Sequence, residues 1–461
     1  MEIKNYSFKE LLSVIIDNRG KTCPVSDKGL PLIATNCIKM DSLYPVFERV
    51  RYVSKETYEN WFRGHPEPED IIFVCKGSPG RVALAPDPVN FCIAQDMLSI
   101  RANKEIVDQK FLFALLRSTE TQTKMLNMHV GTLIPHFKKG DFGNLFFDIP
   151  IDKKIQKNIG DIYHMYSEKI ELNHKMNENI ETMAQALFQS WFVDFDTVLD
   201  NFLAKNDNSV EALPEPLRKK GAIRLKVSKK NTLEINELFP STFVFNEVLE
   251  KWIPEGWAVK TIDDCATVIG GGTPSTKVDE YFCKDGIPWL SPKDLSGYKW
   301  KYIDKGAKDI TDLGLKKSSA KLMPAGTVLF SSRAPIGYIA IAENEVSTNQ
   351  GFKSLIPDKG LPTEYLFQFL KQNAVKIESV ASGSTFKEVS GSALKSIPVI
   401  VPSKSILEEL IKRTKEFNSH LLVNQKQTQN LTKLRDTLLP QLISGKLEVP
   451  EAMLEIEKEI V

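Results

Sequence analysis

The sequence contains an internal repeat, and this feature most constrains what the chain can fold into. A constant shift of 252 positions places residues 131–189 on residues 383–441, with apolar residues, prolines and glycines in a shared register. Further upstream, a shift of 257 places the apolar run 71–73 on the apolar run 328–330. A fixed period of this kind predicts a duplicated architecture. We therefore expect two globular regions, each followed by the same kind of segment.

The segment that follows each globular region is predicted to be a long helix. Each begins near a proline, Pro150 or Pro402, which suits the first turn of a helix because that turn needs no N–H donor. Apolar residues then recur every three or four positions, as in a coiled-coil seam, and the seam includes Asn173 and Asn424. We interpret residues 151–200 as one spacer helix and residues 402–461 as a second spacer helix with a tail; two ordinary packed helices in a large core remain the alternative.

The two globular regions, residues 1–150 and 251–401, are predicted to be mixed α/β. Short apolar runs that are typical of strands alternate with turns rich in proline, glycine and serine. Residues 201–250 are charged and rich in turn-forming residues, which predicts a solvated linker between the two halves. An arm that contacts DNA is the alternative for this linker.

Composition narrows the class of protein. The 461 residues contain no apolar run near the roughly 18–20 that a membrane helix needs, and the charged start does not resemble a signal peptide. The six cysteines are scattered, which favours free thiols in a reducing cytoplasm over disulfides or a zinc site. A net charge of +1 counts mildly against a protein that holds DNA by itself, although a basic face can coexist with acidic faces.

The common catalytic motifs are missing from the sequence. It contains none of the metalloprotease, nucleophile-elbow, dinucleotide or P-loop signatures. Asp87, Asp108 and Lys110 have the loose spacing of a magnesium-dependent nuclease, a pattern so permissive that chance matches are common. A nuclease that uses these three residues therefore stays an alternative, as does a coiled-coil scaffold that never touches DNA.

Basic and aromatic residues in the expected loops point to nucleic acid. The run from Gly297 to Tyr302 alternates lysines with tyrosine and tryptophan, so that lysines can neutralise phosphates while rings contact sugars or bases. The glycine-rich segment 270–277 lacks the Gly-Lys pair of a P-loop, and a tight turn at a strand end is the simpler interpretation. Similar basic and hydroxyl residues occur at comparable places in both halves.

Several stretches resemble the specificity subunit of type I restriction–modification systems. Residues 186–196 are similar to the end of the family's central helix, 253–257 and 272–275 to the start of its second recognition domain, and 438–447 to its C-terminal ending. Together with the repeat, the resemblance covers nearly the whole chain. The first globular region departs from it, because it lacks the Pro-Glu-Gly-Trp start that the second one has at residues 254–257.

The resemblance implies a pseudo-twofold α/β chain with two target recognition domains and two antiparallel helices. Each domain would read one half of a bipartite double-stranded DNA target, and the helices would set the spacing and dock methyltransferase (modification) subunits. No catalytic residue and no cofactor are expected in this chain, because S-adenosylmethionine, ATP and Mg²⁺ belong to the modification and restriction subunits. The resemblance also implies a prokaryotic cytoplasmic protein.

Residues of two kinds are expected to form the contacts. Loop residues with hydrogen-bonding side chains should meet DNA: Arg19, Lys21, Lys76, Ser78, Arg81, Lys138, Thr273, Ser275, Lys293, Trp300, Lys301, Arg333, Tyr338 and Lys387. Trp191 and Phe192 are expected to be exposed aromatics that anchor a helix of a partner subunit.

Overall fold

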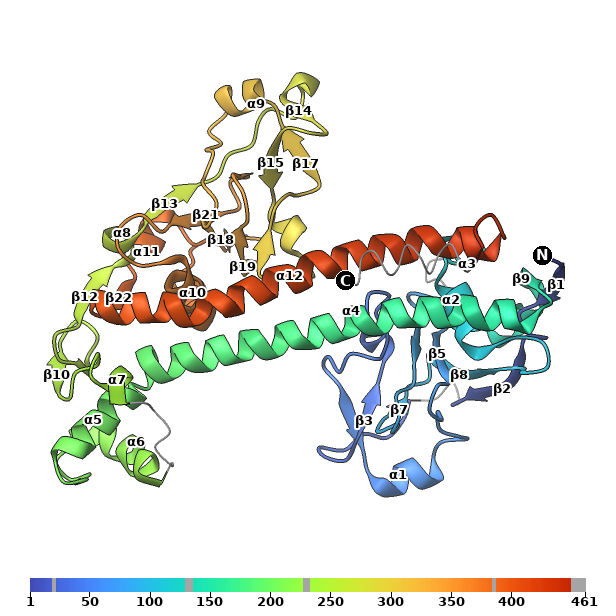
Figure 1. Cartoon of the computed structure of the whole chain (residues 1–461), viewed down its shortest axis with the longest axis horizontal. Coiled ribbons are helices and arrows are strands. Elements are labelled where there is room, and N and C mark those ends of the chain that lie inside the picture. Colours follow the sequence, from blue (N-terminus) through green and yellow to red (C-terminus); the bar gives the residue numbers. More distant parts are fainter. Residues whose placement is uncertain (19–21, 129–135, 227–232, 384–386, 449–461) are drawn as a thin grey trace. The chain divides into compact units, whose positions relative to one another are not determined.

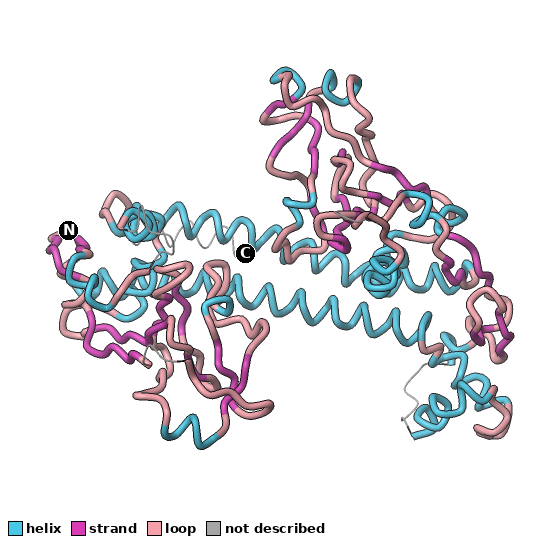
Figure 2. Tube along the Cα trace, turned by 180° about the vertical axis from the view of Figure 1, so that it is seen from behind, coloured by secondary structure: helices cyan, strands magenta, loops and turns pink. Residues whose placement is uncertain are grey.

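The computed structural model describes residues 1–18, 22–128, 136–226, 233–383 and 387–448. The chain divides into two compact units. Unit 1 contains residues 1–176 and 424–461, and unit 2 contains residues 177–423. In both units short strands alternate with long loops (Figure 2). No helix among the described residues is both long and apolar enough to cross a membrane.

Unit 1 is built on a four-stranded antiparallel sheet in the order β2-β8-β5-β6, with a three-stranded sheet β4-β3-β7 and a separate β1-β9 pair (Figure 1). The strands are β1 (Ile3–Ser7), β2 (Leu12–Asp17), β3 (Leu30–Ile33), β4 (Arg51–Val53), β5 (Ile71–Val74), β6 (Val82–Leu84), β7 (Cys92–Ile93), β8 (Met97–Ala102) and β9 (Phe146–Pro150). The helices are α1 (Lys55–Asn60), α2 (Gln109–Arg117) and α3 (Thr119–Asn127).

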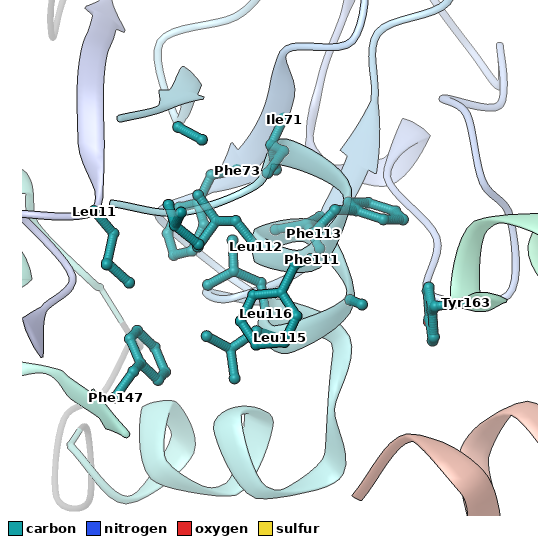
Figure 3. Close-up of a cluster of buried hydrophobic side chains, with 14 of the residues drawn as sticks. Leu11, Ile71, Phe73, Phe111, Leu112, Phe113, Leu115, Leu116, Phe147 and Tyr163 are labelled. Carbon is teal, nitrogen blue, oxygen red and sulfur yellow. The ribbon is translucent and has the colours of Figure 1, made fainter. Parts of the chain in front are cut away.

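The core of unit 1 forms where α2 packs against the four-stranded sheet. Phe111 and Leu112 of α2 are fully buried beside Phe73 of β5 (Figure 3). Residues of two long helices, Ile159 and Leu438, belong to the same hydrophobic cluster. Burial of apolar side chains is the main stabilising contribution to folding, so the long helices are part of the core of unit 1.

Unit 2 repeats this plan with extra strands. A five-stranded sheet has the order β13-β21-β18-β19-β16, and a four-stranded sheet has the order β14-β17-β15-β20. The strands are β12 (Ala258–Thr261), β13 (Thr267–Gly270), β14 (Phe282–Cys283), β15 (Ile287–Leu290), β16 (Tyr302–Ile303), β17 (Lys308–Ile310), β18 (Val328–Ser332), β19 (Ile336–Ala342), β20 (Ser347–Thr348), β21 (Lys353–Ile356) and β22 (Pro398–Val401). The helices are α8 (Ile262–Cys265), α9 (Asp312–Lys316), α10 (Thr363–Ser379) and α11 (Gly391–Lys395).

The sequence repeat corresponds to a repeated fold. The β2-β8-β5-β6 order of unit 1 matches β13-β21-β18-β19 of unit 2. Even single hydrogen bonds are conserved between the copies: the Phe137 N–H donates to the Cys75 carbonyl at 2.8 Å, and the Val389 N–H donates to the Ser332 carbonyl at 3.0 Å. The predicted mixed α/β duplication is therefore confirmed.

Two long helices accompany the sheets, α4 (Lys153–Phe188) and α12 (Lys404–Ile443), each a continuous ribbon in Figure 1. Within unit 1 the Asn173 amide nitrogen donates to the Thr428 hydroxyl at 3.2 Å, and the Arg435 guanidinium lies 3.5 Å from the Ser167 hydroxyl. Residue numbers rise along one helix as they fall along the other, so the pair is antiparallel. Asn173 is fully buried, which agrees with its predicted place on the helix seam.

The prediction of a solvated linker at residues 201–250 is wrong. The first long helix ends at Phe188, and after a π-helical turn (Gln189–Val193) the chain forms α5 (Asp196–Lys205), α6 (Glu215–Lys226), α7 (Leu233–Asn236) and the hairpin of β10 (Phe243–Asn246) and β11 (Lys251–Pro254). Helices α5 and α6 enclose a small apolar core that includes Leu203 and Leu213. The sequence did not predict this core, because its leucines are divided between two short helices within a charged stretch rich in turn-forming residues.

Candidate nucleic-acid interface

In unit 1 the predicted contact residues gather at the turn that joins β5 to β6. Lys76 is exposed and forms a β-bridge with His136, which lies two residues before the exposed Lys138. Ser78 and Arg81 follow in the same turn and are half-buried. Four predicted residues, Lys76, Ser78, Arg81 and Lys138, therefore come together, although Lys138 is distant from the other three in sequence.

Helix α3 holds this turn in place. The Gln122 side chain donates to the Gly80 carbonyl at 2.8 Å. Gly80 has a φ of 90°, and a Cβ atom there would lie 2.6 Å from the sulfur of Met125. A positive φ and a close neighbour both require glycine at this position. The turn is thus a fixed platform for the polar side chains.

Arg19 and Lys21 lie outside the described residues. Asn18, directly before them, is fully buried, and its side-chain oxygen accepts from the Arg63 N–H at 3.1 Å.

In unit 2 the equivalent turn joins β18 to β19 and carries Arg333. The guanidinium of Arg333 lies 3.4 Å from a carboxylate oxygen of Glu388, and the ammonium of Lys353 lies 3.0 Å from the other oxygen. Lys387, next to Glu388, is exposed. Glu388 therefore pairs with Arg333 and Lys353, which come from different elements, and the exposed Lys387 lies next to it in sequence. Lys353 and Glu388 were missed by the sequence analysis, because an ion pair between distant segments leaves no local pattern.

The glycine-rich loop joins the same cluster. The Thr273 hydroxyl donates to the side-chain oxygen of Gln350, and the Ser332 N–H donates to the Gly351 carbonyl at 2.8 Å. Residues 349–351 thus connect the loop of Thr273 with the turn of Arg333. Gln350 was also missed; the polar Asn-Gln-Gly run after β20 was the available signal.

The glycines of this loop serve packing. A Cβ atom at Gly271 would lie 1.9 Å from the Asn349 carbonyl oxygen, and one at Gly272 would lie 2.3 Å from the Ala320 nitrogen. Close approach of backbone segments therefore explains them, as in the tight-turn interpretation. Ser275 lies exposed further along the loop.

The structure also describes three further predicted residues of unit 2, Lys293, Tyr338 and Trp300. Lys293 is exposed and follows Pro292. The ring of Pro292 packs closely against Gly351: a Cβ atom on Gly351 would lie 2.7 Å from the Cγ atom of Pro292. The Tyr338 N–H donates to the Ser331 hydroxyl at 2.8 Å, and its side chain is half-buried. Trp300 is also half-buried.

The prediction that Lys301 contacts DNA is wrong. Its side chain is only 6% exposed, and its ammonium donates to the Asn418 side chain at 2.8 Å, lies 3.8 Å from Glu181 and stands 4.9 Å above the Phe367 ring. Burial lowers the pKa of Lys301, and Glu181 opposes that shift. The alternation of lysines and aromatic residues at 297–302 predicted a surface loop, but Lys301 lies in the interior of unit 2.

The expectation that Trp191 and Phe192 are exposed is also wrong. They are 5% and 3% exposed and belong to the core of unit 2. The Trp191 ring packs edge-on against Phe239, and the Phe192 ring packs edge-on against Tyr365. Their burial removes the basis for treating them as anchors for a partner.

Two of the three residues of the nuclease alternative, Asp108 and Lys110, have structural roles. Asp108 caps α2 by accepting from the Phe111 N–H at 3.0 Å, and Lys110 pairs with Asp161 at 3.2 Å. Within the described ranges no three His, Cys, Asp or Glu side chains are grouped so that they could hold a metal ion. All six cysteines are free thiols, as predicted.

Comparison with known proteins agrees with this arrangement. The family described as the type I restriction modification DNA specificity domain matches residues 23–182 and 254–433, one match in each half of the repeat. The MjaIX specificity subunit of Methanocaldococcus jannaschii is 41% identical over 184 residues, which are 40% of this chain and 42% of that relative. The HindI specificity subunit of Haemophilus influenzae is 31% identical over 379 residues, which are 78% of this chain and 82% of that relative.

The fold has a solved counterpart as well. The crystal structure of a type I restriction–modification S subunit from M. genitalium superimposes with a TM-score of 0.50 at 15% identity, over 96% of each chain. The family match covers well over half of the sequence and both copies of the repeat. This chain belongs to the type I restriction–modification DNA specificity family.

Proposed function

We propose that the chain reads a bipartite DNA sequence, with one half-site for each loop cluster. The observation that carries this proposal is the duplicated turn, β5–β6 in unit 1 and β18–β19 in unit 2, which gathers basic and hydroxyl side chains at equivalent places in both copies. Two copies of one reader in a single chain suit a target with two halves. The DNA-recognition function agrees with the names of the relatives, which are specificity subunits.

Within each cluster the side chains divide by chemistry. The exposed ammonium groups of Lys76 and Lys138 suit phosphates, because a lysine ammonium is a mobile point charge that can neutralise the DNA backbone. Arg333 suits a base edge, because its planar guanidinium can donate two parallel hydrogen bonds to guanine, and Glu388 restricts its orientation. Gln350 keeps its amide N–H donors and one lone pair on the oxygen that accepts from Thr273, so its amide can still donate to N7 and accept from N6 of adenine.

The long helices are proposed to set the half-site spacing and to dock modification subunits. Helix α4 exposes Met165, Leu172, Met176 and Met183, at successive intervals of seven, four and seven residues. That spacing forms a second apolar seam on the helix, besides the one that faces α12. A partner helix that covers this seam takes the docking role first assigned to Trp191 and Phe192.

Catalysis and its cofactors are assigned to the partners. In this proposal the modification subunits bind S-adenosylmethionine, and the restriction subunits bind ATP and Mg²⁺. The chain itself contributes recognition and assembly.

The proposal is tested by selecting bound sequences from a random DNA pool with the purified complex of this chain and its modification subunits. We expect enrichment of one split sequence with a fixed gap. Arg333→Ala should lower the discrimination between the correct and a wrong base at one position of one half-site by about 1–3 kcal/mol. The sequence preference of the other half-site should stay unchanged. Lys404→Ala is the matched control, because Lys404 is 91% exposed at the start of α12 and pairs only with Glu408 of its own helix among the ion pairs of the described residues. Enrichment of no sequence, or equal relaxation of both half-sites, contradicts the proposal.

A further inference from the structure

Two buried arginines line one cavity in unit 1. Arg117, at the end of α2, is 8% exposed, and Arg435, on α12, is 7% exposed. The cavity has a volume of about 190 Å³, and its walls include Tyr163 and the junction of α2 and α3 at Ser118 and Thr119. Tyr163 of α4 lines the cavity, and Figure 3 shows its ring on the opposite side of α2 from Leu11.

The hydrogen bonds of the two guanidinium groups leave donors free. Arg117 donates from Nη1 to the Ser42 carbonyl at 2.9 Å, and its Nη2 is buried with no hydrogen-bond partner in the described part of the chain. Arg435 donates from Nε to Asp436 at 2.9 Å and from Nη1 to the Ser167 hydroxyl at 3.5 Å. Asp436 is the one carboxylate among the described residues that line the cavity, and its side chain is 53% exposed. Two buried cations thus share one half-exposed anion.

This arrangement is electrostatically costly when the cavity is empty. Burial lowers the pKa of Arg117, and the charge of Arg435 acts in the same direction, whereas Tyr163, Asp436 and Asp41 oppose that shift. Although burial acts to lower it, Tyr163 and Asp436 hold the pKa of Arg435 above its ordinary value, so the uncompensated cation is Arg117. A buried donor that is left unpaired costs about 1–3 kcal/mol, and more when it is charged. An anion in the cavity would accept a hydrogen bond from the Nη2 of Arg117 and would offset the repulsion between the two guanidinium groups.

The start of α3 adds backbone N–H donors to the cavity wall. Ser118 is the N-cap of α3, and its hydroxyl accepts from the Thr121 N–H. The first N–H groups of a helix have no partner within the helix, and its positive dipole end favours anions. Both Ser118 and Thr119 line the same cavity as Arg117.

Unit 2 shows how the same position is neutralised in the other copy. Lys371 on α10 stands 5.7 Å above the Phe367 ring, as Arg117 on α2 stands 5.3 Å above the Phe113 ring, each four residues after its aromatic. In unit 2 a carboxylate of α4, Glu181, pairs with Lys371 at 3.2 Å. In unit 1 the residue contributed by the long helix is a second cation, Arg435. Among the ion pairs of the described residues Arg117 has no carboxylate partner, whereas Lys371 of unit 2 pairs with Glu181.

We propose that Arg117, Arg435 and the first turn of α3 bind an oxyanion of the phosphate class. Two guanidinium groups and a helix N-terminus match the several oxygens of such an ion. The inference is independent of the proposed DNA-reading function, because none of these residues belongs to the two loop clusters.

The test is calorimetric titration of the full-length chain with inorganic phosphate in a chloride buffer of constant ionic strength. We expect saturable binding to the wild type and a rise of its thermal midpoint on the order of 2–4 °C at saturating phosphate. Arg435→Glu places a carboxylate in the cavity beside Arg117, as Glu181 lies beside Lys371 in unit 2, and should weaken phosphate binding at least tenfold without lowering the midpoint in phosphate-free buffer. Arg413→Met is the matched control on the same helix, because Arg413 pairs with Glu409 at 2.9 Å and does not line the cavity.

A second variant and a DNA arm complete the test. Arg435→Met should also lose phosphate binding, and it replaces Arg435→Glu if that variant does not fold. Release of bound phosphate by an excess of duplex DNA would assign the anion to a DNA backbone, and its retention would assign it to a free ion; both results support the site. No saturable binding to the wild type, or wild-type affinity in both Arg435 variants, would overturn the proposal.

Discussion

At the scale of single residues, charge and aromaticity in the sequence indicate chemistry but not exposure. Lys76 and Lys138 lie on the surface as predicted, whereas Lys301 is buried beside Glu181. Trp191 was expected outside and packs in the core. The difference arises from tertiary partners that are far away in sequence, such as Glu181 for Lys301, and no local pattern reports them. The sequence therefore identifies the chemical type of a side chain but not whether that side chain is exposed and so available to DNA.

The buried cluster around Glu181 predicts a pH-dependent stability. Although burial acts to raise the pKa of Glu181, Lys301 and Lys371 hold it below its ordinary value of 4.5. A carboxylate with a lowered folded-state pKa stabilises the fold above its unfolded pKa, and that contribution is lost as the pH falls through the folded-state value. Urea unfolding between pH 7 and pH 3 should therefore show a steeper acid loss for the wild type than for Glu181→Gln. Glu416→Gln, on the exposed surface of α12, is the control and should behave like the wild type; equal slopes for all three proteins would show that the cluster contributes nothing.

At the scale of elements, the sequence predicted the long helices better than the segment between them. Prolines at the start and a seam spaced by three and four residues indicated α4 and α12, with ends that differ from the predicted ones by up to about a dozen residues. The predicted linker instead contains α5 and α6, because a small core of four leucines is hidden in a charged and turn-rich stretch. Periodicity over many residues is a strong signal, whereas two short helices that pack on each other provide a weak one.

The packed state of this segment is tested by Leu203→Ala. Leu203 is fully buried between α5 and α6, so its truncation should destabilise the segment by about 2–4 kcal/mol. Limited proteolysis should then cleave between residues 199 and 226 faster than in the wild type. Leu225→Ala, at a position that is 40% exposed, should leave the cleavage rate unchanged. A wild-type rate for Leu203→Ala would restore the solvated-linker interpretation.

The second apolar seam of α4 predicts the effect of a charge on assembly. Leu172 is 50% exposed, so Leu172→Glu should leave the chain folded and weaken binding of the modification subunits at least tenfold, since a buried charge in an apolar interface is costly. Analytical ultracentrifugation of the mixed subunits measures this binding. Glu178→Lys, a charge change on another face of the same helix, is the control. Unchanged assembly of Leu172→Glu would remove the seam from the interface.

At the scale of the whole molecule, duplication is the property that the sequence showed most clearly. The shifts of 252 and 257 positions match strand orders and hydrogen bonds that occur twice in the structure. Sequence identity between the copies is low, so side chains can diverge while the backbone plan persists. This is why the fold was predictable and the members of each contact cluster, including Gln350 and Glu388, were not.

The most direct test of the central claim is to map DNA methylation in cells that carry the cognate modification subunits, with and without this chain. The account predicts that one split, two-part sequence is methylated only when the chain is present. It also predicts that Arg333→Ala broadens one half of that sequence and leaves the other half unchanged. An identical set of methylated sequences in the presence and absence of the chain, with the modification subunits active, would contradict its role as the subunit that reads the sequence.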